Sequence, residues 1–310
     1  MRLLFSILIV ATLARPAAAA EKLTVLLDWF VNPDHAALVV AAERGMFEKA
    51  GLEVELVAPA DPSAPPRLVA AGKGDIAVTY QPQLHVQVAE GLPLIRIATL
   101  AETPLNTLVA LKAGPVKTIA DLKGKTVGFS VGGFEDALLR TMLGQAGLGL
   151  DDVTLVNVNF ALTQSLEAGK VDAVIGAFRN VEVNQLDLDG HPGIAFYPEE
   201  HGVPVYDELV AVARADRVDD PALRKFVDVI EQATLWLTNH PDEAWQLFIK
   251  SHQDLDNELN RRAWADTLPR LAKRPGALDR HRYERFAEYM KAAGLIKDVP
   301  PLDSYAVELK

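Results

Sequence analysis

Two short glycine-containing segments, each typical of the end of a helix, occur as a pair in this chain, and the pair is found twice. We call these segments helix stops. An Ala-Gly-Leu stop at 50–52 is followed by an Ala-Gly-Lys stop at 71–73, and the same pair returns at 146–148 and 168–170. The offsets between matching stops are 96 and 97 residues. A glycine just past the last helical residue suits the left-handed conformation that ends many helices. The near-constant offset indicates two similarly built halves, although glycine stops also occur in any α/β protein.

Short apolar runs near these stops are typical of strands, so each half is predicted to be an α/β unit. The runs expected to form strands are 23–27, 54–57, 75–78, 126–129, 153–156 and 172–175. The expected helices are 36–49, a short one that ends near 71, 134–145, and one that ends near 168. Both halves place a turn and a helix start after a strand, and open parallel sheets bind ligands at that edge.

The chain is expected to pass between the two halves twice, at Leu105–Lys112 and at Glu208–Arg214. Later helical segments should pack on the first half, because a separate helical unit would need its own apolar core; they are 222–238, 241–250, 258–272 and 280–293. The prediction is an α/β protein with two doubly wound sheets, joined by two hinge strands around a cleft. Lobe 1 is expected to comprise 21–110 plus 209–310, and lobe 2 to comprise 111–208. Two crossings favour hinge closure.

The first twenty residues are typical of a cleaved secretory signal. Arg2 precedes an apolar run from Leu3 to Leu13, and small residues end the segment at Ala18-Ala19-Ala20. A run of this length falls far short of the ~20 residues that span a bilayer. We therefore expect a signal peptide over 1–20 and a mature periplasmic protein that begins at Glu21.

Charge and composition exclude several classes of protein. The formal net charge is −11, with no block of Lys and Arg, so binding of nucleic acid is not expected. The chain has no cysteine, which excludes disulfides, thiolate nucleophiles and cysteine-bound metals. The seven histidines form no metal-binding pair at helical spacing, and the chain lacks a Gly-x-Ser-x-Gly nucleophile elbow and a phosphate-binding glycine loop. No catalytic residue, metal or cofactor is assigned.

The predicted ligand-facing turns contain aromatic and amide side chains instead. Such a set suits a flat heteroaromatic ligand, which stacks on aromatic faces and pairs its ring edge with amide, imidazole or carboxyl groups. Glu182 is especially informative, because a carboxylate between Val181 and Val183 is costly to bury without a partner. The candidate ligand-binding residues are Asp28, Trp29, Asn32, His35, Tyr80, Gln81, His85, Asn106, Gly132, Gly133, Phe178, Asn180 and Glu182.

Structural roles remain open for many of these residues. Trp29 and Phe178 could belong to the core, and Asn32 and Asn106 are common turn residues. The two histidines among the candidates stand at apolar helix starts, where a buried structural role is as common as ligand binding. Asp34 could simply cap the helix that follows it.

Four motifs in order carry a resemblance to a known family. They are Asp28–Phe30 with Asn32–His35, Tyr80–His85, Gly128–Glu135 and Phe178–Glu182. With these motifs the chain resembles the NMT1/THI5-like family from about Leu23 to Arg214, and most closely its solute-binding branch. The resemblance implies a two-lobe, type II periplasmic-binding-protein fold. It also implies a monomer that delivers an aminopyrimidine thiamine precursor, formylaminopyrimidine or hydroxymethylpyrimidine, to the permease and ATPase of an ABC importer.

Two other branches provide alternatives. One branch synthesises hydroxymethylpyrimidine phosphate by consuming pyridoxal phosphate and one of its own histidines, and His85 aligns with that histidine. The lysine that anchors the cofactor aligns with Gln81, which forms no Schiff base, and the cysteine run of that branch aligns with Val203–Asp207. Other relatives bind taurine or sulfonates. Such an anion calls for basic groups, and Arg179 is the one basic residue in the motifs listed above.

Overall fold

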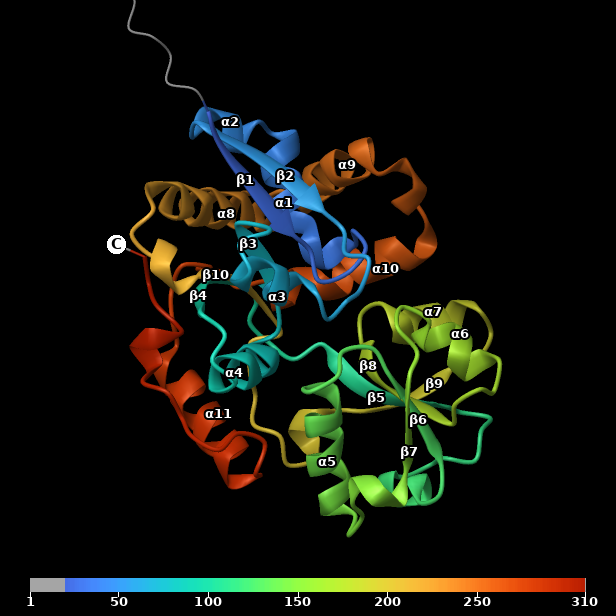
Figure 1. Ribbon diagram of the computed structural model, residues 1–310. Coiled ribbons are helices and arrows are strands. Elements are labelled where there is room, and N and C mark those ends of the chain that lie inside the picture. Colours follow the sequence, from blue (N-terminus) through green and yellow to red (C-terminus); the bar gives the residue numbers. More distant parts are fainter. Residues whose placement is uncertain (1–19, 310) are drawn as a thin grey trace, which may run out of the picture.

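The computed structural model describes residues 20–309, which form two five-stranded sheets with helices packed against them (Figure 1). The expected signal peptide therefore lies, except for Ala20, outside the described residues. The first sheet has the order β2-β1-β3-β10-β4, and the second has the order β7-β6-β8-β5-β9. The strands of the first sheet are β1 (Glu21–Leu26), β2 (Leu52–Val57), β3 (Ile76–Thr79), β4 (Leu94–Ala101) and β10 (Leu209–Arg214). Those of the second are β5 (Asn106–Leu111), β6 (Thr126–Phe129), β7 (Thr154–Asn157), β8 (Ala173–Phe178) and β9 (Gly193–Phe196).

The two sheets have the same construction, which confirms the expected duplication. In each sheet the three strands predicted from the repeat run parallel: β2, β1 and β3 in the first, and β7, β6 and β8 in the second. The fourth position holds an antiparallel strand that follows a passage from the other sheet. This strand is β10 in the first sheet and β5 in the second.

The chain passes between the sheets at 102–105 and at 197–208. Strand β5 pairs with β8 on one side and β9 on the other, so its backbone is satisfied within the second sheet. The lobe boundary expected after residue 110 therefore falls before β5 in the structure, at about residue 105. Glu208 joins the two passages, because its Oε2 accepts from the backbone N–H groups of Leu105 (2.6 Å) and Asn106 (2.9 Å).

The helices belong to two lobes, and each lobe is built around one of the two sheets. The first lobe holds the first sheet with α1 (Ala36–Glu43), α2 (Met46–Lys49), α3 (Pro65–Ala70), α4 (Gln81–Ala89), α8 (Pro221–Asn239), α9 (Pro241–Ser251), α10 (Glu258–Thr267) and α11 (Arg280–Ala292). The second lobe holds the second sheet with α5 (Glu135–Gln145), α6 (Leu162–Glu167) and α7 (Glu182–Leu188). Among residues 20–309, no helix has the length and apolar character that crossing a membrane requires.

Two predicted helices are shorter than expected. The helix predicted over 36–49 is divided into α1 and α2, because Gly45 adopts a left-handed conformation with φ of 62°. The helix predicted over 258–272 ends at Thr267, where a single 3-10 turn containing Pro269 follows. Both breaks come from residues with special backbone requirements inside otherwise periodic segments.

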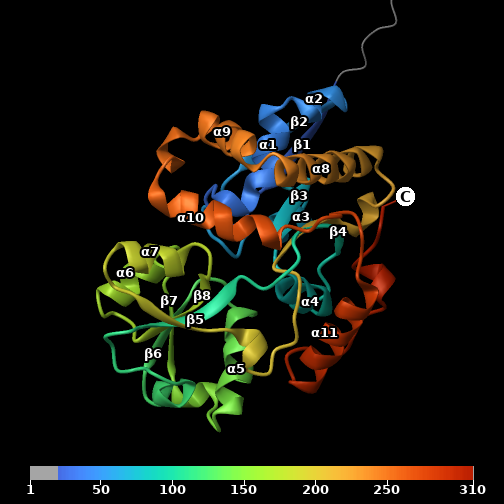
Figure 2. The same ribbon diagram turned by 180° about the vertical axis from the view of Figure 1, so that it is seen from behind.

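The C-terminal helices cover the first lobe, as expected. Helix α8 has a continuous buried face that includes Leu223, Phe226, Ile230 and Leu237, and it packs with α9 against α1. Helix α10 goes further, since it also contacts α7 of the second lobe (Figures 1 and 2). The two lobes are thus connected by α10 as well as by the two passages of the chain.

Candidate functional site

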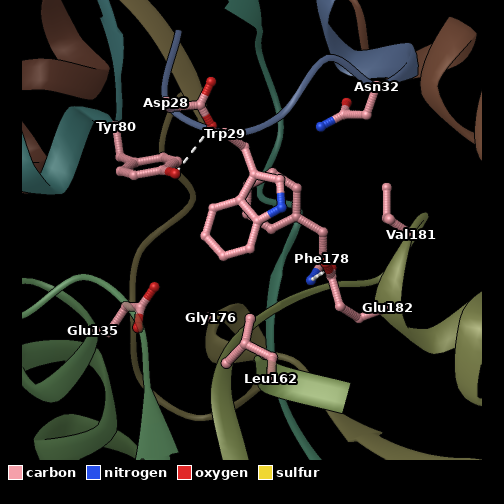
Figure 3. Close-up of a pocket in the computed structure, with 10 residues that line it drawn as sticks. All are labelled: Asp28, Trp29, Asn32, Tyr80, Glu135, Leu162, Gly176, Phe178, Val181 and Glu182. Atoms are coloured by element: carbon pink, nitrogen blue, oxygen red, sulfur yellow. Dashed lines mark hydrogen bonds between the residues drawn. The ribbon is translucent and has the colours of Figure 1, made fainter. Parts of the chain in front are cut away.

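A cavity lies between the two lobes, where the ends of β1, β3 and β8 meet (Figure 3). It contains about 350 Å³ of empty space, including its open mouth. Its walls combine aromatic rings with carboxyl groups, and they contain no Lys, Arg or His. The lining residues are Asp28, Trp29, Asn32 and Tyr80 from the first lobe, and Glu135, Leu162, Gly176, Phe178, Val181 and Glu182 from the second. Six of the predicted site residues are among them: Asp28, Trp29, Asn32, Tyr80, Phe178 and Glu182.

Asp28 is the centre of a hydrogen-bonded group on the first-lobe wall. Its Oδ2 accepts from the Tyr80 hydroxyl (3.0 Å), and its Oδ1 pairs with His35 Nε2 (2.9 Å). The backbone N–H of Asn32 points to His35 Nδ1 at 3.3 Å, so the ring hydrogen lies on Nε2 and is donated to Asp28. Burial raises the pKa of the Tyr80 phenol well above its usual value, which keeps this hydroxyl a donor. His35 therefore positions Asp28 and does not itself line the cavity.

Aromatic rings from both lobes meet around the cavity. Tyr80 stacks on Phe134 of the second lobe, with ring centroids 4.9 Å apart, and meets Phe178 edge-on at 6.3 Å. Trp29 contacts Phe160, which lies between β7 and α6, at 4.6 Å and an interplanar angle of 70°. The first-lobe rings thus pack directly against second-lobe rings beside the cavity, and these aromatic contacts connect the two lobes.

Two glutamates provide the carboxyl groups of the second-lobe wall. Glu135, the first residue of α5, is buried, and its Oε2 accepts from the backbone N–H groups of Ser130 (2.7 Å) and Val131 (3.1 Å). Glu182, the first residue of α7, accepts from Phe178 N–H (2.7 Å). Burial raises the pKa of Glu135 to about 8 and that of Glu182 to about 7. Both carboxyl groups can therefore hold a proton near neutral pH, and each can then donate as well as accept.

Asn180 does not line the cavity, and beside it forms a hydrogen bond that connects the two lobes. Its Nδ2 donates to Asp34 Oδ1 (2.7 Å) and lies 2.8 Å from the Thr267 hydroxyl of α10. Thr267 also donates to Asp34 Oδ1 at 2.8 Å. Burial raises the pKa of Asp34 to about 6, even though these two hydrogen bonds act to lower it. The sequence left open that Asp34 only caps the helix that follows it. In the structure Asp34 also forms a hydrogen bond between the two lobes.

Besides His35 and Asn180, five more predicted residues lie outside the cavity wall, and four of these five have clear structural roles. Gln81 exchanges hydrogen bonds with Asp207 in the return passage, through its N–H (3.3 Å) and its Oε1 (2.8 Å). His85 packs among the rings of Tyr283, Phe286 and Tyr305, where burial lowers its pKa to about 3. Asn106 accepts from the backbone N–H of Gly176 (3.2 Å). Gly132 and Gly133 precede α5, and Gly133 N–H donates to Asp136 (2.6 Å).

Sequence reasoning missed four lining residues and one ring beside them. Leu162, Gly176 and Val181 are ordinary residues of strands and helix starts, and nothing in the sequence marks them as site residues. Glu135 had a usable signal, because it is an acidic residue at a helix start that follows two glycines and an apolar residue. Phe160 gave none, since it lies in a loop with no motif. Among residues 20–309, no group of three or more His, Asp or Glu side chains is arranged to hold a metal ion.

Comparisons with known proteins agree with this architecture. A family model described as NMT1/THI5 like matches residues 32–244. A protein of Haemophilus influenzae named for thiamine biosynthesis is 54% identical over 99% of this chain and 98% of its own length. The formylaminopyrimidine-binding protein of Halalkalibacterium halodurans is 33% identical over 83% of this chain and 78% of its own. A 4-amino-5-hydroxymethyl-2-methylpyrimidine phosphate synthase of Legionella pneumophila is more distant, at 24% identity over 90% and 88% of the two chains.

Solved structures share the fold. The alkanesulfonate-binding protein SsuA of Xanthomonas axonopodis pv. citri superposes with a TM-score of 0.71 over 94% of this chain and 98% of its own, at 18% identity. The two-lobe α/β architecture is therefore that of periplasmic binding proteins. The family match covers most of the chain, and relatives of 54% and 33% identity cover 99% and 83% of it, so this chain belongs to the NMT1/THI5-like family.

Proposed function

We propose that this chain is the periplasmic substrate-binding component of an ABC importer, and that it binds an aminopyrimidine precursor of thiamine. Formylaminopyrimidine and hydroxymethylpyrimidine are the two candidate ligands. The name of the Halalkalibacterium relative supports this ligand class. Residues 1–20 would direct export and be removed, and the mature protein would act as a monomer alongside the permease and ATPase subunits.

One observation carries the proposal: the cavity combines aromatic rings with carboxyl groups on both lobes, in the absence of any basic side chain among its lining residues. An aminopyrimidine presents two flat faces, an exocyclic amino donor and a ring nitrogen beside it. Trp29, Tyr80 and Phe178 provide ring surfaces, and Glu182 provides a carboxyl group that can meet the amino group and the ring nitrogen together. The ligand would be held by both lobes and would favour their closure.

The cavity is poorly suited to a sulfonate, which is the first alternative. Arg179, the basic residue in the motifs, forms a two-point ion pair with Glu199 (2.7 and 3.0 Å) and does not line the cavity. The helix starts near the cavity also offer few free N–H groups, since carboxylates of Glu135 and Asp136 already accept from the turn before α5. An anion in this cavity would lose its hydration without gaining a cation.

The positions that align with the catalytic lysine and histidine of the synthase branch also argue against catalysis. Gln81 is engaged with Asp207, and His85 is enclosed by aromatic rings with its imidazole uncharged. Neither residue reaches the cavity wall. We therefore propose binding and release of an unchanged ligand, with no reaction and no cofactor.

Native mass spectrometry of the mature protein, purified from its own periplasm, tests this proposal. We expect a bound species with the mass of an aminopyrimidine, which is released unchanged on denaturation. A sulfonate in its place would support the first alternative. A pyrimidine that is converted into a new product during incubation would contradict the assignment of a binding protein.

A further inference from the structure

Glu135 presents an unused carboxyl oxygen at the second-lobe wall, opposite the group formed by Asp28 and Tyr80. The residue begins α5 and is only 3% exposed, yet it lines the cavity (Figure 3). Its Oε2 is occupied by two backbone N–H groups, from Ser130 and Val131. No group among residues 20–309 donates to Oε1. Because Glu135 lines the cavity and its Oε2 is occupied, Oε1 is the carboxyl oxygen that is free to contact a ligand.

The glycine at position 176 is what admits this carboxyl group. Gly176, on β8, has a φ of 101°, which L side chains rarely adopt. A Cβ atom at this position would lie 2.6 Å from Glu135 Cδ and closer still to Oε1. Any other residue at 176 would therefore displace the Glu135 carboxyl group. The backbone of β8 at Gly176 therefore packs directly against the side chain at the start of α5, and both belong to the cavity wall.

The occupied oxygen determines where a proton on Glu135 must lie. A carboxyl group whose Oε2 accepts two N–H bonds carries its proton on the other oxygen, Oε1. Burial raises the pKa of Glu135, and nearby carboxyl groups of Glu208 and Asp136 raise it further. Tyr80 also faces it and remains protonated, while Asp28 lies across the cavity. The group thus presents an O–H donor to the ligand near neutral pH.

We propose that Glu135, with Gly176, is a specificity residue that donates a hydrogen bond to an oxygen atom on the ligand's side chain. This inference rests on the proposed function and names its ligand more narrowly. The ligand class is an aminopyrimidine with an uncharged carbonyl or hydroxyl substituent. Glu182 forms hydrogen bonds with the edge of the ring, and Glu135 donates a hydrogen bond to the oxygen of the substituent.

The same arrangement excludes phosphorylated pyrimidines. A phosphate group would lie near the Glu135 carboxyl group, with no Lys, Arg or His among the lining residues to balance its charge. The backbone donors of the turn before α5, which otherwise suit a phosphate, are taken by Glu135 and Asp136. A dianion that loses its water in such a cavity gains no compensating partner.

Calorimetric titrations with four ligands that share one ring test the inference. The ligands are formylaminopyrimidine, hydroxymethylpyrimidine, its 5-methyl analogue without the oxygen, and hydroxymethylpyrimidine phosphate. For the wild-type protein we expect the hydroxymethyl ligand to bind about tenfold or more tightly than the methyl analogue, because a buried donor without a partner is costly. The phosphate is expected to bind at least about a hundredfold more weakly than the hydroxymethyl ligand.

Variants at Glu135 then locate the origin of this discrimination. Glu135→Leu should bind the hydroxymethyl and methyl ligands with nearly equal affinity. We expect the affinity of the wild type to fall above about pH 8, where Glu135 loses its proton. Glu135→Gln keeps an N–H donor but does not titrate, so it should still prefer the hydroxymethyl ligand and should not show this fall. Asp136→Asn is the matched control, because its side chain lies outside the cavity wall and retains the oxygen that accepts from Gly133.

The outcomes separate this inference from the proposed function. The role proposed for Glu135 is wrong if Glu135→Leu keeps the full preference for the hydroxymethyl ligand, or if the wild type binds the phosphate as tightly as the hydroxymethyl ligand. In either case the proposal that the protein binds a pyrimidine still holds. If the wild type binds none of the pyrimidines, the proposed function itself is wrong.

Discussion

Asn180 of the second lobe donates a 2.7 Å hydrogen bond to Asp34 of the first lobe, across a separation of 146 residues in the sequence. Both side chains are buried, and the Thr267 hydroxyl of α10 donates to the same oxygen of Asp34. Hinge opening would have to break the bond between Asn180 and Asp34, whereas Thr267 and Asp34 both belong to the first lobe. This contact therefore acts as a latch that favours the closed arrangement of the lobes.

Loss of the latch should weaken ligand binding without unfolding the protein. We expect Asn180→Ala to reduce the binding free energy by about 1.5–3 kcal/mol, the range for hydrogen bonds that involve a charged group. Asn184→Ala is the comparison, because Asn184 donates to Asp266 (2.9 Å) at an exposed position between α7 and α10, and to the backbone oxygen of Asn180 (2.9 Å). Calorimetry with the pyrimidine measures both. Equal effects of the two substitutions would show that the buried latch has no special role.

The free energy of unfolding of the ligand-free protein should fall as pH rises from 6.5 to 8.5. Burial raises the pKa of Glu182 and Glu208 to about 7, and that of Glu135 to about 8. In this window the folded protein holds protons that the unfolded chain has already released, so a higher pH favours unfolding. Each group contributes up to about 1.4 kcal/mol per pH unit between its two pKa values. The opposing effect of His85, whose pKa is lowered, lies mainly below pH 6.5.

Urea denaturation at the two pH values measures this dependence. Glu208→Gln keeps an oxygen for the N–H groups of Leu105 and Asn106 but does not titrate, so it should reduce the difference between the two pH values. Glu208 lies outside the cavity wall, which separates this effect from ligand binding. A wild-type protein that is equally stable or more stable at pH 8.5 would contradict the prediction.

Stacking on Trp29 should contribute measurably to affinity. We expect Trp29→Ala to weaken pyrimidine binding by about 1–3 kcal/mol, on the scale of base stacking on aromatic residues, and Trp29→Phe to lose less because it keeps a ring. Trp236→Phe on α8 is a control outside the cavity, where Arg44 lies over the indole ring. An unchanged affinity of Trp29→Ala, with the fold intact, would mean that Trp29 serves only in packing.

Phe160 should control how fast the ligand leaves. Its ring lies 4.6 Å from Trp29 and 4.6 Å from Phe30, so it bridges the two lobes. Each aromatic pair contributes about 0.5–1.5 kcal/mol, and Phe160→Ala should accordingly raise the dissociation rate by about five- to a hundredfold. Stopped-flow fluorescence measures the rate, with the exposed Leu235→Ala as control. A dissociation rate that matches the wild type would show that this contact does not limit opening.

The sequence predicted most of the fold because its signals are local. The glycine stops at 51, 72, 147 and 169 all adopt left-handed conformations in the structure, and the strands they delimit form the two parallel cores. Strands β4 and β9 were not predicted, since both lie outside the repeated pattern. Register and pairing with distant strands leave little trace in a single sequence.

The site was predicted in part for the same reason. Tyr80 follows β3 directly, and Trp29 and Glu182 come three and four residues after the ends of β1 and β8, so their position at this edge could be inferred from the order of elements. Asn180 and His35 lie beside the cavity and do not line it, and their partners, Asp34 and Asp28, could be assigned only from tertiary structure. Gly176 contributes through the absence of a side chain, and no property of the sequence around it indicates that Glu135 needs the space.

A calorimetric titration of formylaminopyrimidine into the wild-type protein and into Glu182→Ala tests directly whether the cavity binds a pyrimidine through Glu182. Glu182 lies at the start of α7 and lines the cavity, and we propose that its carboxyl group meets the amino edge of the ring. We predict saturable binding at one site in the wild type and at least a tenfold loss in the variant, because the ligand's donors would be left unpaired in a closed cavity. Absence of binding by the wild type, or equal affinity in the two proteins, would contradict the account.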